Sequence, residues 1–310
     1  MTMRTIRIRS LAAGMLAAAL AWPAAASAEF LTGVEVAAGY RNDSLNWDIS
    51  TDPSGLSAPN VLSELSWKNL NILEMQARVH AENDYGFYAK AELSYGWIVH
   101  GRNQDSDYDG NNRTQEFSRS NNSSNGSYVW DGSFGLGYAL HPNEDWSIIP
   151  LVGAAMDTQK VVMKDGYQTI GDGVRVPLPG PFAGLNSSYK ADWWGPWGGL
   201  DVQYTAGRLQ LGASGEYHWD VAYSGTGDWN LRPKTLSDKA WHGRGYVAGG
   251  SIGWALDENW TLRAAGRWRD FTVDRGTENQ WLAGAPIGDL SFNHAHWSST
   301  SGSLGLEYRF

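Results

Sequence analysis

Leu304-Gly305-Leu306-Glu307-Tyr308-Arg309-Phe310, the last seven residues, form the stretch of sequence that decides the fold. Their apolar side chains alternate with glycine, a carboxylate and a guanidinium, so the apolar ones share one face of an extended strand. One apolar face toward hydrocarbon and one polar face toward a wet lumen is the pattern of a transmembrane β-barrel strand. A soluble sandwich can also end on such a strand, so the rest of the chain has to decide between them.

The N-terminus has the parts of a secretory signal peptide. Three arginines precede an apolar run over residues 11–26, which ends at the small-x-small site Ala26-Ser27-Ala28. The run is shorter than the roughly 20 residues that span a bilayer, and Pro23 interrupts it. We therefore expect residues 1–28 to be cleaved on export and residues 29–310 to form one barrel in the bacterial outer membrane.

The composition favours the same class. The chain has 17 Trp and 14 Tyr, residues that gather where a barrel meets the lipid headgroups, and Trp193-Trp194-Gly195-Pro196-Trp197 is expected in the outer aromatic girdle. A mean hydropathy of −0.41 is too polar for a helical membrane protein but suits strands with one apolar face. The net charge of −9 argues against a nucleic-acid partner, and a chain without cysteine has neither disulfides nor thiolate metal sites. A soluble secreted β-protein ranks last.

Turn signals divide the chain into strands. Short ones rich in turn-forming residues lie at 82–86, 141–145, 205–208 and 257–259. Longer polar stretches lie at about 50–60, 102–126, 164–188, 224–240 and 275–291. The expected fold is all-β: a ten-stranded, up-and-down, antiparallel transmembrane barrel with five long outer loops and four short periplasmic turns.

The predicted lumen is charged and crowded. The inward positions of the alternating segments carry both signs, which lets buried charges pair with one another. Ten strands enclose a narrow lumen, so we expect interlocked side chains rather than a wide porin channel. The alternating segments also exceed the roughly 9–11 residues that cross a membrane, so the barrel should project above it. The predicted inward charged residues are Glu74, Arg78, Lys90, Glu92, Glu216, Arg263 and Arg267.

Two short motifs resemble the omptins, ten-stranded outer-membrane proteases in which a carboxylate pair faces an Asp-x-His pair across the barrel mouth. Asp105 and Asp107 occupy the predicted second outer loop, and Asp228 the fourth. The resemblance implies catalytic roles for these three aspartates. Asn230, however, stands where the histidine should be, and an amide cannot accept a proton as imidazole does near neutral pH. We expect little peptidase activity, and an endopeptidase with an altered site is the alternative.

The chain as a whole is closer to an omptin-related group that is named for a Protochlamydia outer-membrane protein. Residues 103–108, 117–122 and 165–169 carry this second resemblance, which covers most of the mature chain. The function of that group is largely undefined. The favoured role is non-enzymatic, a structural or surface-exposed binding barrel. Its expected surroundings are outer-membrane lipid and lipopolysaccharide, and its candidate ligand is an extracellular protein or glycan.

The predicted second loop also matches a calcium-loop pattern. Asp105, Asp107, Asp109 and Glu116 stand at the liganding positions 1, 3, 5 and 12 of Asp-x-Asp-x-Asp-Gly-x5-Glu. Against a calcium site, no helices are expected to flank the loop, and Arg113 brings a positive charge close to it. The alternative is a solvated acidic loop.

Overall fold

The structure is a computed structural model that describes residues 30–52 and 57–310. The predicted signal peptide, residues 1–28, lies outside the described residues. In the described part of the chain, no helix is both long and apolar enough to cross a membrane.

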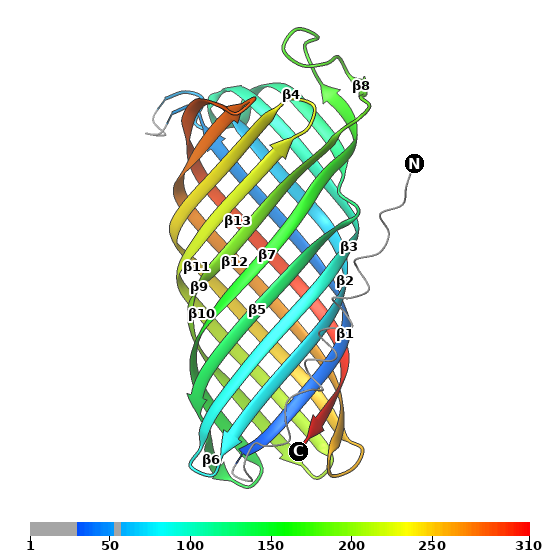
Figure 1. Ribbon diagram of the computed structural model, residues 1–310, viewed down its shortest axis with the longest axis vertical. Helices are drawn as coiled ribbons and strands as arrows, with labels where there is room; N and C mark the ends of the chain where they lie inside the picture. The colour runs from blue at the N-terminus through cyan, green and yellow to red at the C-terminus, as the bar shows by residue number, and fades with distance from the viewer. Residues whose placement is uncertain (1–29, 53–56) are drawn as a thin grey trace.

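The described residues form one antiparallel sheet of thirteen strands and a single 3-10 turn at Asn111–Arg113. The sheet closes on itself, because β1 pairs with both β2 and β13 while β2 also pairs with β3 (Figure 1). This confirms the predicted antiparallel β-barrel. The strands are β1 (Phe30–Ser50), β2 (Ser63–Asn83), β3 (Phe87–Gly110), β4 (Thr114–Ser123), β5 (Ser127–Tyr138), β6 (Leu140–Asn143), β7 (Trp146–Ile170), β8 (Gly180–Pro181), β9 (Asn186–Ala206), β10 (Leu209–Trp229), β11 (Lys234–Ala255), β12 (Trp260–Leu282) and β13 (Ala285–Arg309).

The closed ring passes through ten strands. β4 and β5 together take the place of one strand between β3 and β7. The short β6 and β8 pair only with β7. Figure 1 shows a tall barrel whose strands all tilt across its axis. We call the end that carries residues 111–113 and 230–233 the loop end, and the opposite end, near Phe310, the turn end.

Several connections at the loop end are much shorter than predicted. The stretch 102–126 was expected to be a long loop, but β3 runs to Gly110 and β4 begins at Thr114. In the stretch 224–240, only residues 230–233 lie between β10 and β11. Beyond the membrane the outer face of a strand meets water, so such a strand needs no apolar outer face. Its polar, glycine-rich sequence therefore resembles that of a loop.

The predicted orientation of the terminal strand is confirmed. Leu304 and Leu306 are exposed on the outside of β13, and Phe310 is exposed directly after it, whereas Glu307 is buried in the lumen. The same alternation covers the outside of the turn-end half with apolar side chains, and on β3 this band ends at Val99. Residues closer to the loop end therefore lie beyond the lipid-facing band.

The lumen of the loop-end half is filled by a hydrophobic cluster. Along β1 the inward residues change from Glu35 and Arg41 near the turn end to Leu45, Trp47 and Ile49 near the loop end. Aromatic rings from many strands meet in this cluster; Trp193, for example, lies 4.6 Å from Tyr223, centroid to centroid. The large fully buried rings of this cluster are those of Trp47, Trp67, Tyr189, Trp193, Phe271, Phe292 and Trp297.

Candidate functional site

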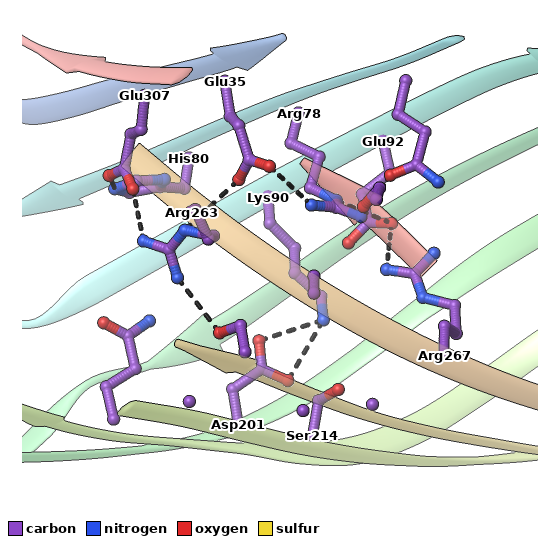
Figure 2. A pocket seen from close by; sticks show the side chains of 18 of the residues that line it. Glu35, Arg78, His80, Lys90, Glu92, Asp201, Ser214, Arg263, Arg267 and Glu307 are labelled. Carbon is purple, nitrogen blue, oxygen red and sulfur yellow. Dashed lines mark hydrogen bonds and ion pairs between the residues drawn. The ribbon is translucent and has the colours of Figure 1, made fainter. Parts of the chain in front are cut away.

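The turn-end half of the lumen holds a small charged chamber of about 150 Å³. Long charged side chains line it together with small residues such as Ser214, Gly249 and Gly250. Figure 2 shows several of the charged side chains converging on the chamber. A volume of this size holds several water molecules or one molecule about as large as benzene. The hydrophobic cluster lies between it and the loop end.

Charges of opposite sign pair throughout this chamber, as predicted. Lys90 Nζ lies 3.0 Å from Asp201 and 3.3 Å from Glu216 (Figure 2). Arg267 of β12 reaches across the lumen to Glu92 of β3, with its Nη2 atom 2.5 Å from the carboxylate. Further pairs include Arg78 with Glu35 at 2.8 Å, Arg309 with Glu307 at 2.8 Å, and Arg263 with Glu307.

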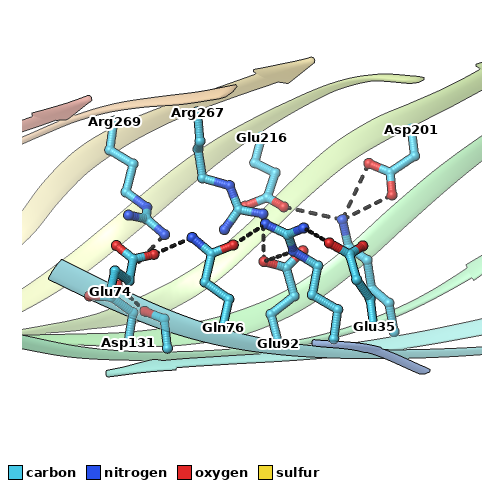
Figure 3. Close-up of polar contacts among 12 residues, drawn as sticks. Glu35, Glu74, Gln76, Glu92, Asp131, Asp201, Glu216, Arg267 and Arg269 are labelled. Atoms are coloured by element: carbon cyan, nitrogen blue, oxygen red, sulfur yellow. Dashed lines mark hydrogen bonds and ion pairs between the residues drawn. The ribbon is translucent and has the colours of Figure 1, made fainter. Parts of the chain in front are cut away.

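A second charged layer lies between the chamber and the hydrophobic cluster. Its centre is Arg41, which is fully buried and contacts Asp43 at 2.7 Å, Asp131 at 2.5 Å and Glu74 at 3.7 Å. Arg269 approaches Asp131 from the other side at 3.7 Å (Figure 3). Arg41 and Arg269 each pair with carboxylates in this layer. Carboxylates therefore lie between the arginines, which do not form an uninterrupted row along the lumen.

Asp105 and Asp107 point into the lumen at the loop end. Asp105 lies directly opposite the buried Leu65 of β2, and residues directly opposite in a ladder share a face. The inward face of β3 is formed by even-numbered residues up to Ile98. It then passes to odd-numbered residues across the register shift beside Asn71. That irregularity turns both carboxylates inward.

The two carboxyl groups form one acidic pair. Burial, and then the neighbouring charge of Asp107, raise the pKa of Asp105 to about 8. Burial also raises the pKa of Asp107, although the hydroxyls of Ser63 and Ser118 donate hydrogen bonds to its carboxylate. At neutral pH the pair therefore retains a proton.

The groups that face this acidic pair are cations. The positive charges of Arg232 and Lys234 are close enough to oppose the rise in pKa of both aspartates. Sequence reasoning missed these two residues, because nothing in their spacing marks them as partners of a segment more than 100 residues away. These cations offset part of the cost of burying negative charge on the two acids.

Asp228, the third predicted catalytic residue, does not join the pair. Asp228 is exposed on β10. Its neighbours along the strand are the buried Gly227, which lies opposite the buried Leu236 of β11, and the half-buried Trp229. Alternate residues of a strand point to opposite faces, so the Asp228 carboxylate lies on the outside of the barrel.

Asn230, at the position where an omptin has histidine, links two loops. Its Oδ1 accepts hydrogen bonds from the backbone N–H of Asn186 at 2.7 Å and from Ser187 Oγ at 3.1 Å. Its Nδ2 donates to the carbonyl of Gly184 at 2.7 Å. The amide thus uses both its donor and its acceptor to hold the start of β9 against the end of β10.

Replacing Asn230 with alanine is expected to lower the free energy of unfolding by about 1–2 kcal/mol, because three side-chain hydrogen bonds are lost. Asn230→Asp, which keeps the acceptor and loses the donor, should cost less. Denaturant unfolding in detergent measures both. A loss from Asn230→Asp as large as that from Asn230→Ala would contradict the assigned role of Oδ1.

The predicted calcium site is not formed. Asp105, Asp107 and Asp109 lie along the extended strand β3, and Tyr108 pairs with Glu116 across a hairpin, so the segment does not wrap around an ion. Asp109 instead pairs with Arg175, and Glu116 with Arg119. Within the described ranges, no three His, Cys, Asp or Glu side chains gather to hold a metal ion.

Comparison with known proteins places the chain in a family. The family model described as Protochlamydia outer membrane protein matches residues 35–310. The chain belongs to this family. No curated protein matches its sequence.

Among solved structures, the outer membrane protease OmpT from Escherichia coli has a similar fold. It is 16% identical, the match covers 90% of this chain and 97% of that one, and the TM-score is 0.79. The translocator domain of the autotransporter NalP from Neisseria meningitidis is 12% identical over 97% and 96% of the two chains, with a TM-score of 0.35. At such identities the likeness to OmpT shows the fold alone. Together with the family match, it confirms an omptin-like outer-membrane barrel.

Proposed function

We propose that this family member is a closed, non-enzymatic outer-membrane barrel that presents its loop end as a binding surface. In this proposal residues 1–28 are cleaved, and residues 29–310 form ten strands joined by five outer loops and four periplasmic turns. The loop end then faces outward, with outer-membrane lipid and lipopolysaccharide around the barrel. The observation that carries the proposal is the sealed lumen: paired charges fill one half and a hydrophobic cluster fills the other.

The loop end offers exposed aliphatic side chains to a partner. Val174 is 90% and Leu178 is 67% exposed on the segment beside β8, which projects beyond the barrel in Figure 1. Leu231, in the connection 230–233, and Ile287, near the start of β13, are also exposed. Exposed apolar groups outside the lipid-facing band support recognition of an extracellular protein or glycan.

Purified protein is expected to insert into planar bilayers without producing conductance steps, because the hydrophobic cluster occupies the loop-end half of the lumen. Folding of the barrel is verified on a gel, where the unboiled protein should migrate differently from the boiled protein. Stable steps that scale with salt concentration would show an open lumen and contradict the closed barrel.

The endopeptidase remains the second candidate, because the acidic pair keeps its place on an omptin-like fold. Peptides with paired basic residues are expected to stay intact with the wild type. They should also stay intact with Asn230→His, because Asp228 points away from the lumen and Asn230 is bound to β9. Wild-type cleavage that disappears in Asp105→Asn would establish the enzyme instead.

Binding is tested on extracellular protein and glycan arrays with the refolded barrel. The double variant Val174→Ser with Leu178→Ser should weaken any specific signal, and Leu140→Ser, which changes an exposed leucine at the turn end, serves as the control. Equal signals from both variants would show that Val174 and Leu178 are not part of the binding surface.

A further inference from the structure

Two buried carboxyl groups face one another near the loop end, apart from the acidic pair on β3. Asp238 of β11 and Glu278 of β12 are directly opposite in the ladder, and both residues are 0% exposed. One oxygen of each, Asp238 Oδ1 and Glu278 Oε2, has no hydrogen-bond partner among the described residues. Two unpartnered acceptors side by side in a buried site are costly unless a hydrogen lies between them.

The other oxygens of this carboxyl pair are held by fixed donors. Tyr189 Oη donates to Asp238 Oδ2 at 2.6 Å and lies 2.6 Å from the hydroxyl of Tyr223. Gln280 Nε2 donates to Glu278 Oε1. Gly225, opposite Asp238 on β10, leaves room for this contact, since a Cβ there would lie 1.9 Å from Tyr189 Oη.

Few charges surround the pair. Lys234, on the same strand as Asp238, is the cation that acts on both acids, and it also acts on Asp105 and Asp107. No ion pair to Asp238 or Glu278 is formed within residues 30–52 and 57–310. On the neighbouring strands the facing groups are Tyr189 and Asp192 of β9, Tyr223 of β10 and the apolar Leu290 of β13.

We propose that Asp238 and Glu278 share one proton at neutral pH, and that this hydrogen bond fastens β11 to β12 at the loop end. The proton lies between Asp238 Oδ1 and Glu278 Oε2, so the pair carries one negative charge instead of two. Without the proton, two carboxylates would repel each other at short range in a site of low dielectric constant. The connections at residues 230–233 and 283–284 lie just beyond this point, so repulsion there opens the loop end first.

The effect on stability has a definite sign. Burial, and then the Glu278 charge, raise the pKa of Asp238 in the folded chain, and burial raises that of Glu278. The unfolded chain releases its protons at lower pH than the folded chain. The pair therefore makes folding less favourable as pH rises above the ordinary carboxyl pKa values of about 4.

Glu278→Gln tests the proposal, because an amide donates to Asp238 without needing a proton. We expect its denaturation midpoint in detergent to exceed that of the wild type at pH 8 and to fall less steeply between about pH 5 and pH 9. Glu258→Gln, at an exposed residue of the turn 256–259, is the control and should keep the wild-type slope. Other acids titrate in the wild type and in Glu278→Gln alike. The relevant quantity is therefore the difference between the pH slopes of their denaturation midpoints.

Infrared spectroscopy detects the proton directly. A carbonyl band of a buried protonated carboxyl group is expected in the wild type at neutral pH, reduced in Glu278→Gln and unchanged in Glu258→Gln. Asp238→Asn supplies a second route if Glu278→Gln does not fold. Equal bands and equal pH slopes in the wild type and the folded variant would overturn the shared proton.

Discussion

Replacing Arg41 with methionine is expected to destabilise the folded barrel by about 3–5 kcal/mol, the usual result of breaking a buried ion pair by removing one partner. Arg41 is fully buried among Asp43, Asp131 and Glu74, so its loss leaves three carboxylates around an apolar stem. Denaturant unfolding of the refolded protein in detergent, followed by tryptophan fluorescence, measures the change.

The control for this variant is Arg175→Met. Arg175 also pairs with two carboxylates, Asp109 and Asp172, but it is exposed at the loop end, where water screens the charges. Its midpoint should stay near that of the wild type. Asp131→Asn combined with Arg41→Met should recover part of the loss, because one of the stranded charges is removed. Equal effects of Arg41→Met and Arg175→Met would show that burial of the ion pairs does not matter.

Replacing Trp193 with alanine is expected to cost about 3–5 kcal/mol, because it opens a cavity in the packed interior of the loop-end half. Trp193 is fully buried, its ring lies 6.2 Å from those of Phe271 and Trp297, and its Nε1 donates to Gln159 at 3.1 Å. Thermal and denaturant unfolding both report the loss.

Two comparisons isolate the packing effect at position 193. Trp193→Phe retains most of the ring and should lose clearly less than the alanine variant. Trp241→Ala removes a tryptophan that is exposed on the outside of β11 and should also lose less. A loss from Trp241→Ala as large as that from Trp193→Ala would mean that the lipid-facing band, and not the interior cluster, dominates stability.

The turn-end half of the barrel could be predicted from the sequence because membrane and lumen impose a strict alternation there. Leu304 and Leu306 face outward, and the mixed charges of Lys90, Glu92 and Arg267 pair inside, as expected. In the loop-end half the alternation persists, but the inner face is apolar as well, so the pattern does not tell the inside from the outside. The aromatic motif at 193–197 was assigned to the outer girdle, but Trp193 and Trp197 are buried and Trp194 alone of its tryptophans is exposed.

The candidate site was only partly predictable for a related reason. Spacing places Asp105 and Asp107 on the same face, but the register shift beside Asn71 decides that this face is the inner one. Asp228 lies two residues before Asn230 as the omptin pattern requires, yet its strand phase directs it outward. Lys234 of β11 acts on Asp105 and Asp107 of β3, a relation between distant strands that no local pattern encodes.

The hydrophobic cluster has a consequence for assembly. Its members come from both ends of the chain: Trp47 of β1 lies 6.2 Å from Phe292 of β13, and Arg41 stacks on Trp297 at 5.5 Å. The interior can therefore become dry only when the first and last strands meet, since until then the rings on either side of the seam face water. Contacts so distant in sequence form late. A barrel that lacks its final strand would be leaky as well as incomplete, so ring closure and sealing are one event.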